Sequence, residues 1–171
     1  DLRALIDTEL VRQHRDQALT PDRPVLRGSA QNPDVFFQAR EACTPFHAAV
    51  PDAVQAAMDR FAGLTGRQYH LADYHGAPDA DRVVVLMGSG AGAVREAVDA
   101  LNAAGERVGV LTLHLYRPFP AAQLLAALPP TVRTVVVLDR CKEPGAPFDP
   151  LHLDVLSAMW HSPEDHWADG Q

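Results

Sequence analysis

The residues best suited to chemistry in this sequence form a glycine-rich turn. Gly88, Gly90 and Ala93 match the G-x-G-x-x-G/A pattern, in which small residues let a backbone approach a dinucleotide pyrophosphate closely. The pattern needs a strand before the turn and a helix after it, and the apolar run 83–87 and the helical repeat at 93–101 meet this need. The turn therefore either binds a cofactor through Gly88, Ser89 and Gly90, or only lets a strand and a helix pack closely.

The second half of the dinucleotide pattern is missing. An acid that holds the ribose 2′-hydroxyl should follow about 20 residues later, near residues 112–115, and no Asp or Glu stands there. Arg117 could instead meet a 2′-phosphate, but its neighbours Tyr116, Pro118 and Phe119 favour a packed corner. We interpret the glycines as mainly structural and keep a nucleotide-binding oxidoreductase domain for NAD(P), FAD or coenzyme A as the alternative.

A charged loop follows the predicted strand at 134–138, where open α/β sheets bind their ligands. Arg140 and Lys142 are candidates for contact with a cofactor, although they could equally pair with Asp139 and Glu143. Cys141 stands among them, and the two cations could favour its thiolate. Because no His or second Cys is near it in the sequence, an ordinary loop thiol is the competing interpretation.

The polar segment 27–34 is the remaining candidate site, for an anion or for a protein interface. The alternative is local: Asn32 caps a helix and Arg27 pairs with Asp34. His70 and His75 flank a predicted loop, and the sequence identifies no partner for either, so no catalytic triad can be assembled. The residues that we select as interface candidates are Arg27, Asn32, Asp34, Tyr116 and Arg117.

Hydrophobic periodicity, together with Gly and Pro punctuation, predicts the elements that position these residues. Helices are expected at 2–19, 32–42 and 51–65, with a short turn at 44–46. Farther on, strands are expected at 68–74, 83–87, 108–113 and 134–138, and helices at 93–101, 121–128 and 151–160. The fold class is therefore α/β: a mostly parallel open sheet with flanking helices and right-handed crossovers, preceded by a Pro-punctuated helical segment.

Composition excludes several classes of protein. The net charge of −7 over 171 residues, with scattered Arg residues, disfavours a nucleic-acid binder. No apolar run approaches the roughly 20 residues that span a bilayer, and no signal peptide is recognisable. The two cysteines, Cys43 and Cys141, and the eight histidines lack metal-ligand spacing, so we expect no metal site. Two distant cysteines also imply no disulfide framework, so we expect a cytoplasmic location.

Five segments resemble, in order, the pyruvate:ferredoxin (flavodoxin) oxidoreductases. The similar segments are 27–38, 64–67, 85–90, 115–119 and 138–146. The resemblance implies a piece of a large enzyme that decarboxylates a 2-oxo acid on thiamine diphosphate with magnesium. In that family, electrons leave through [4Fe-4S] clusters to ferredoxin or flavodoxin, and the acyl group passes to coenzyme A.

The resemblance also implies a domain organisation. Residues 1–66 would be the helical tail of a pyrimidine-binding domain, 67–161 a domain similar to the transketolase C-terminal domain, and 162–171 an irregular tail. The cofactor-binding and catalytic segments of the family fall outside these residues, so no catalytic residue or cofactor is assigned here, and the piece alone is expected to be inactive. Its expected partners are the remaining domains of the parent oxidoreductase, which would form a homodimer.

Two departures from the family accompany this resemblance. Cys141 stands where the family more often has Thr, which argues against a fixed chemical role for a thiol there. The chain also stops before a segment that in the family supplies a further strand, so we expect an exposed sheet edge. A further hypothesis is a docking module without activity, which binds the remaining domains. It differs little from the hypothesis that the chain is a scaffold of the oxidoreductase.

Overall fold

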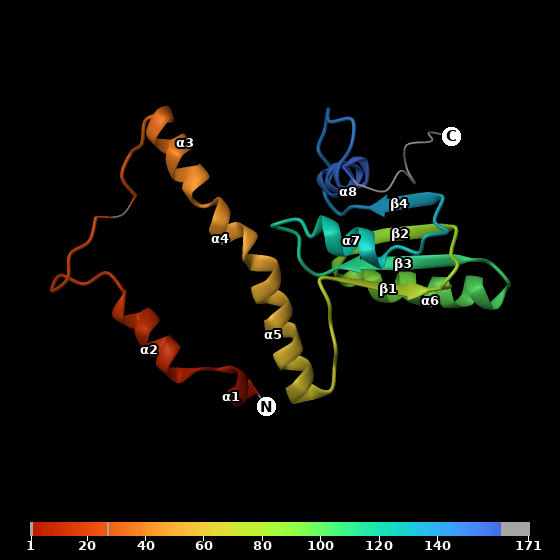
Figure 1. Ribbon diagram of the computed structural model, residues 1–171, viewed down its shortest axis with the longest axis horizontal. Helices are drawn as coiled ribbons and strands as arrows, with labels where there is room; N and C mark the ends of the chain where they lie inside the picture. Colours follow the sequence, from red (N-terminus) through yellow and green to blue (C-terminus); the bar gives the residue numbers. More distant parts are fainter. Residues whose placement is uncertain (1, 27, 162–171) are drawn as a thin grey trace. The chain divides into compact units, whose positions relative to one another are not determined.

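The computed structural model describes residues 2–26 and 28–161, apart from the side chain of Leu2 (Figure 1). The chain divides into two units, Asp1–Gln68 and Tyr69–Gln171. The candidate Arg27 and the expected tail at 162–171 lie outside the described residues.

The first unit is helical, as expected, but its first helix is divided. The chain forms α1 (Leu2–Leu5) and α2 (Thr8–Asp16) instead of one helix over 2–19. The interruption falls at Asp7, whose carboxylate accepts hydrogen bonds from the backbone N–H of Glu9 at 2.9 Å and of Leu10 at 3.2 Å. Asp7 therefore acts as the N-cap of a new helix, because a short acidic side chain competes with continued helical backbone bonding.

Three further helices complete the first unit. They are α3 (Pro33–Ala42), α4 (Thr44–Ala48) and α5 (Val50–Thr65). Gly66 ends α5 in the left-handed region, with φ of 74°, as its position in the sequence predicts. No described residue between 3 and 68 is buried, so the apolar side chains of this unit have no core of their own.

The second unit is a four-stranded mixed sheet. Its strands are β1 (Ala72–Gly76), β2 (Arg82–Met87), β3 (Val108–Leu113) and β4 (Thr134–Leu138), in the order β1-β3-β2-β4 (Figure 1). β2 pairs in parallel with both β3 and β4, while β1 is antiparallel to β3. The α/β class and the mostly parallel sheet are therefore confirmed. The strand expected at 68–74 is wrong in its bounds, because pairing with β3 runs from Ala72 to Gly76.

Helices cover both faces of this sheet. A 3₁₀ turn (Gly88–Gly90) leads from β2 into α6 (Ala91–Ala103), and the later helices are α7 (Ala121–Ala127) and α8 (Pro150–Trp160). One face packs α7 and α8 into a core with Leu111, Leu113 and Val85. The other face packs α6 through Val98 against Leu86 and Val110.

β4 forms an edge of the described sheet. Its side chains alternate between exposed and half-buried, and Val136 and Leu138 are exposed. Such an edge presents unpaired backbone groups. The further strand that the family resemblance implies stays a prediction.

Close backbone packing between β1 and β3 depends on two paired glycines. Gly76 and Gly109 are register partners, and Gly76 has φ of 136°, a conformation that other residues rarely adopt. A Cβ at Gly76 would lie 2.5 Å from the carbonyl oxygen of Val108. The ring of Tyr74 covers Gly109, and its hydroxyl donates to the carbonyl of Ala77 at 2.5 Å.

Replacing Gly76 with Ala is expected to lower the free energy of unfolding by about 2 kcal/mol or more, because backbone strain and a clash with backbone atoms add. Urea denaturation monitored by circular dichroism measures the change. The matched control is Gly92→Ala in α6, where nothing lies within 4 Å of the added Cβ and φ is not positive. This control should be neutral or stabilising by up to about 1 kcal/mol. Equal stabilities of the two variants would contradict the role of Gly76.

No helix in the described part of the chain is long and apolar enough to cross a membrane.

Candidate functional site

The carboxyl ends of β2 and β4 bring two candidate segments together. These neighbouring parallel strands place the glycine turn beside the loop that starts at Asp139. A guanidinium N–H of Arg140 donates to Oγ of Ser89, with Nη1 and Oγ 3.3 Å apart. The structure therefore joins Ser89 and Arg140, which stand far apart in the sequence.

The topology makes this place a switch point of the sheet. The connection after β2 enters α6 on one face, whereas the connection after β4 enters α8 on the other face. Open α/β sheets bind ligands where neighbouring connections diverge in this way. The backbone of the turn would also suit a ligand site. Gly88 has a positive φ of 78°, and Gly90 leads into α6 with φ of −67°.

Several charged groups of the β4 loop nevertheless already have partners, in the loop itself or at the start of α8. Asp139 accepts hydrogen bonds from the backbone N–H of Cys141 at 2.9 Å and of Leu151 at 2.8 Å, so it caps α8 from the start of the loop that leads into this helix. Lys142 Nζ lies 3.6 Å from a carboxylate oxygen of Asp149. The cation that the sequence selects beside Arg140 is thus paired within its own loop.

The electrostatics of this loop favour one of the two interpretations of Cys141, the ordinary loop thiol. Partial desolvation, followed by the negative charges of Asp139, Glu143 and Asp149, raises the pKa of the Cys141 thiol. The nearby cations therefore do not favour its thiolate, because the carboxylates outweigh them. The same negative charge disfavours an anionic ligand at this loop.

Tyr116 and Arg117 connect the loop after β3 to α8. The guanidinium carbon of Arg117 lies 4.1 Å from the centre of the Tyr116 ring, and Nη2 lies 2.7 Å from a carboxylate oxygen of Asp154. Desolvation, and then the hydrogen bond and charge of Asp154, raise the pKa of the Tyr116 hydroxyl. Arg117 is therefore held by a carboxylate of its own unit, which leaves it poorly placed to meet a 2′-phosphate.

His70 and His75, for which the sequence identifies no partner, each lie beside a carboxylate in the structure. Nδ1 of His70 lies 2.7 Å from Oδ1 of Asp73, and Nε2 of His114 lies 3.2 Å from Oδ2 of the same residue. Nε2 of His75 lies 2.6 Å from Oδ1 of Asp99. Sequence reasoning missed these pairs. The spacing of His70 and Asp73 could have indicated the first, but His75 and Asp99 meet only through the packing of α6 on the sheet.

The candidates of the first unit lie at the start of α3. Asn32 occupies the N-cap position, and Pro33 opens the helix with Asp34 in its first turn. The side chain of Asn32 makes no capping hydrogen bond, which corrects the expectation for this residue. The expected pairing of Asp34 with Arg27 stays a prediction, because Arg27 lies outside the described residues.

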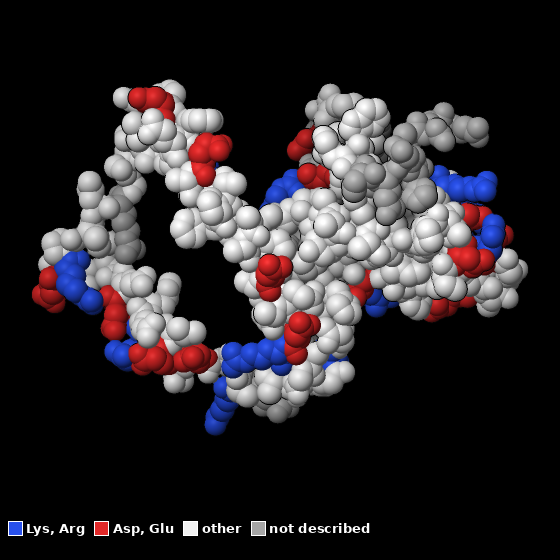
Figure 2. All heavy atoms as spheres, viewed as in Figure 1, with Lys and Arg blue, Asp and Glu red and all other residues white. Residues whose placement is uncertain are grey.

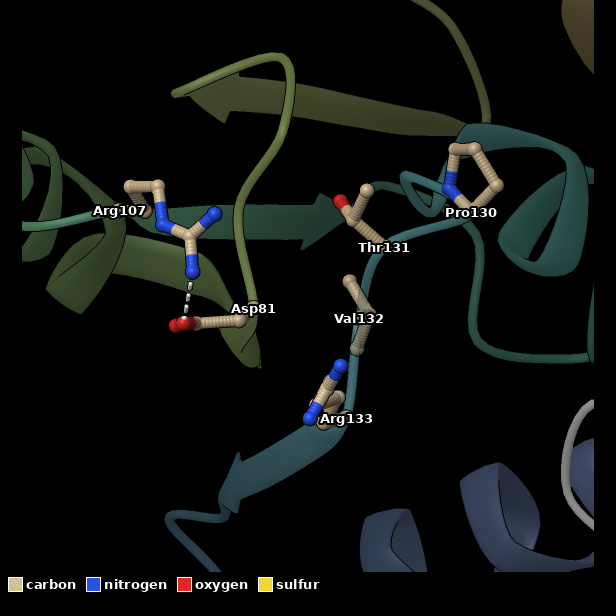
Figure 3. A pocket seen from close by; sticks show the side chains of 6 residues that line it. All are labelled: Asp81, Arg107, Pro130, Thr131, Val132 and Arg133. Atoms are coloured by element: carbon tan, nitrogen blue, oxygen red, sulfur yellow. Dashed lines mark hydrogen bonds and ion pairs between the residues drawn. The ribbon is translucent and has the colours of Figure 1, made fainter.

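A pocket of about 240 Å³ lies away from these candidates, at the amino ends of β2 and β4 (Figure 3). Asp81, Arg107 and residues 130–133 line it, and Nη2 of Arg107 lies 2.9 Å from Oδ2 of Asp81. The backbone carbonyl of Asp81 accepts from Arg133 N at 2.8 Å and from Thr134 N at 3.0 Å. These contacts position the start of β4, so we interpret the pocket as a structural junction.

The potential metal ligands of the described residues do not cluster in space. Among the described residues, no group of three or more His, Cys, Asp or Glu side chains could hold a metal ion. The two cysteines of the sequence cannot supply the four thiolates that a [4Fe-4S] cluster takes. The residues of this chain therefore do not fit such a cluster.

The fold and the site define an α/β domain with a mixed sheet, in which the described residues assemble no complete catalytic constellation. Residues 80–167 match the family model for pyruvate:ferredoxin oxidoreductase core domain II. This match covers just over half of the chain, and the chain belongs to this family of oxidoreductases. The domain has the fold of the transketolase C-terminal domain, as the sequence resemblance implies.

Several relatives extend the similarity over nearly the whole chain. The pyruvate-flavodoxin oxidoreductase of Trichormus variabilis is 57% identical over 160 residues, which are 94% of this chain and 13% of the relative. The pyruvate-flavodoxin oxidoreductase of Rhodospirillum rubrum is 59% identical over 159 residues, 93% of this chain and 13% of the relative. A third, from Nostoc, is 50% identical over 96% of this chain and 40% of its own length. The chain thus spans only a small part of the first two relatives.

The first prediction from the site concerns the thiol of Cys141. Because its raised pKa keeps it protonated at neutral pH, alkylation by iodoacetamide should be slow and should accelerate only at higher pH. Glu143→Gln removes one of the responsible charges, so the pKa should fall and the rate at pH 7.5 should rise about twofold or more. Peptide mass spectrometry measures the rate at this cysteine. Glu96→Gln in α6 is the control, and an equal rise in both variants would contradict the explanation.

The second prediction concerns nucleotides. Because the β4 loop carries more carboxylates than cations, we expect no change in Tm when NAD, NADP, FAD or coenzyme A is added in a thermal-shift scan. The scan also decides the alternative of a nucleotide-binding domain. A saturable rise in Tm that Arg140→Ala abolishes would favour that alternative.

Proposed function

We propose that this chain is part of a thiamine-diphosphate-dependent oxidoreductase that converts pyruvate, or a related 2-oxo acid, to acyl-CoA and CO₂ and reduces flavodoxin or ferredoxin. The observation that carries the proposal is the 50–59% identity of nearly the whole chain to relatives named pyruvate-flavodoxin oxidoreductases. Within that enzyme, this chain is a scaffold and a domain interface.

The side chains of this chain indicate which cofactors the other domains of the parent enzyme would bind. Thiamine diphosphate would supply the carbanion chemistry that decarboxylates a 2-oxo acid. The chain has two cysteines, and Asp139 and Lys142 of the charged loop after β4 already have partners in Leu151 and Asp149. Thiamine diphosphate, magnesium, the [4Fe-4S] clusters and coenzyme A are therefore assigned to the remaining domains of the parent enzyme.

The apolar surface of the first unit supports the interface role. Phe36, Phe37 and Phe46 are exposed, and Phe46 retains 77% of its accessible surface. Each aromatic side chain typically buries 150–250 Å² in a core or an interface, so exposing several close together is costly. α3 and α4 therefore require a partner surface, which we assign to the rest of the pyrimidine-binding domain.

The charge distribution agrees with protein partners. On the face drawn in Figure 2, Lys and Arg residues are interspersed with Asp and Glu residues, and the sequence has a net charge of −7. Nucleic-acid binding needs clustered cations.

We propose that the parent enzyme is a cytoplasmic homodimer whose electron acceptor, flavodoxin or ferredoxin, docks on other domains.

The activity test uses the complete parent polypeptide. Purified anaerobically with thiamine diphosphate and magnesium, it should reduce flavodoxin or ferredoxin when both pyruvate and coenzyme A are present. Acceptor reduction is followed by absorbance, and omission of coenzyme A is the control. No reduction with pyruvate or any other 2-oxo acid would contradict the proposal.

The scaffold role has its own test in the 171-residue chain. Isothermal titration with thiamine diphosphate and magnesium should release no binding heat, since the cofactor-binding groups are assigned elsewhere. The complete parent polypeptide is the positive control. Tight binding by the 171-residue chain would place the cofactor site within these residues and refute the scaffold role.

A further inference from the structure

We propose that the outward face of α8 is an interdomain contact, which another domain of the same parent polypeptide covers. The proposal rests on the proposed function insofar as this chain must be part of a longer polypeptide. It adds a specific surface, made of Phe148, Leu153, Leu156 and Trp160, which we call the α8 stripe.

α8 is apolar on two opposite sides. Its inward residues Leu151, Val155 and Ala158 are buried against the sheet. Its outward residues Leu153, Leu156 and Trp160 follow one another at i, i+3 and i+7, and they are 41%, 46% and 82% exposed. An apolar stripe along a helix typically packs against another surface.

α6 shows what a solvated helix of the same unit looks like. It also buries one stripe, through Val98, but its exposed positions include Glu96, Asp99, several alanines and a single large apolar side chain, Leu101. The α8 stripe instead places two leucines and a tryptophan outward. The difference between two helices of one sheet indicates that α8 faces another protein surface.

The surroundings of the α8 stripe suit an apolar partner. Phe148, exposed just before the helix, is included in the stripe because its ring stacks on His152 of α8, with centroids 4.3 Å apart and planes at 10°. The neighbouring charges are neutralised, since Asp154 pairs with Arg117 at 2.7 Å and Asp149 lies 3.6 Å from Lys142. A partner can therefore cover the stripe without leaving an unpaired carboxylate at its rim.

The area of the stripe favours a domain of the same chain over a second copy. Four partly exposed side chains offer on the order of 400 Å², whereas a stable complex between separate molecules buries about 800 Å² from each partner. A domain on the same polypeptide has a millimolar effective concentration, so a smaller contact suffices. The relatives carry most of their length outside the part that this chain matches, which supplies such a domain.

The test uses the parent polypeptide with Leu156→Cys, and with Glu96→Cys as the matched exposed control. Maleimide labelling of each cysteine is measured by peptide mass spectrometry, relative to the same protein unfolded in urea. Leu156→Cys should label at least tenfold more slowly in the native protein than in the unfolded one, and Glu96→Cys should change by less than threefold. Labelling of Leu156→Cys at the unfolded rate, or equal protection of both positions, would overturn the proposal.

A crosslinking experiment identifies the occupant. A photo-crosslinking amino acid replaces Trp160 in two coexpressed copies of the parent that carry different affinity tags. Crosslinks within one polypeptide are expected, and a product that carries both tags would overturn the proposal in favour of a second copy. The assay is separate from catalysis. If the unmodified parent oxidised no 2-oxo acid but the stripe were protected, the proposed function would fail and this contact would stand.

Discussion

The parallel pairing of β2 with both β3 and β4 is the constraint on which the rest of the second unit depends. β2 lies between these two strands, with Val83 and Val85 buried, so its hydrogen bonds on both sides are protected from water. The same pairing sets the level at which each strand ends. The loops after β2 and β4 therefore meet at one edge of the sheet, where Arg140 reaches Ser89.

That edge lies where open α/β sheets bind ligands, but several of its polar groups already have partners within the protein. Asp139 uses its two carboxylate oxygens to hold the backbone of Cys141 and of Leu151, and Arg117 is held by Asp154. Polar groups that satisfy one another keep a loop in one conformation and leave little capacity for a ligand. These contacts fix the loop and the start of α8, which supports the scaffold role that we propose.

Both units expose large apolar side chains to solvent. In the first unit, the described helices bury no residue, and in the second, the α8 stripe points away from the sheet. Water tolerates single exposed apolar side chains, but not contiguous groups of aromatic and aliphatic ones. If the chain is part of a longer oxidoreductase, as we propose from its identity to much longer relatives, other domains would cover these surfaces.

The sequence by itself determined the fold class, the bounds of β3 and β4 and the family. Apolar and β-branched runs bounded by Gly, Pro or charged residues leave little freedom, because their periodicity and their end signals are local. Local signals also located the glycine turn and the charged loop, but they could not tell whether the loop favours a thiolate at Cys141. Only the tertiary structure decided the strand order, the antiparallel direction of β1, and the pairs Arg140–Ser89 and His75–Asp99. Those features depend on contacts between residues distant in sequence, where the burial of both faces of the sheet, and not local propensity, sets the energy.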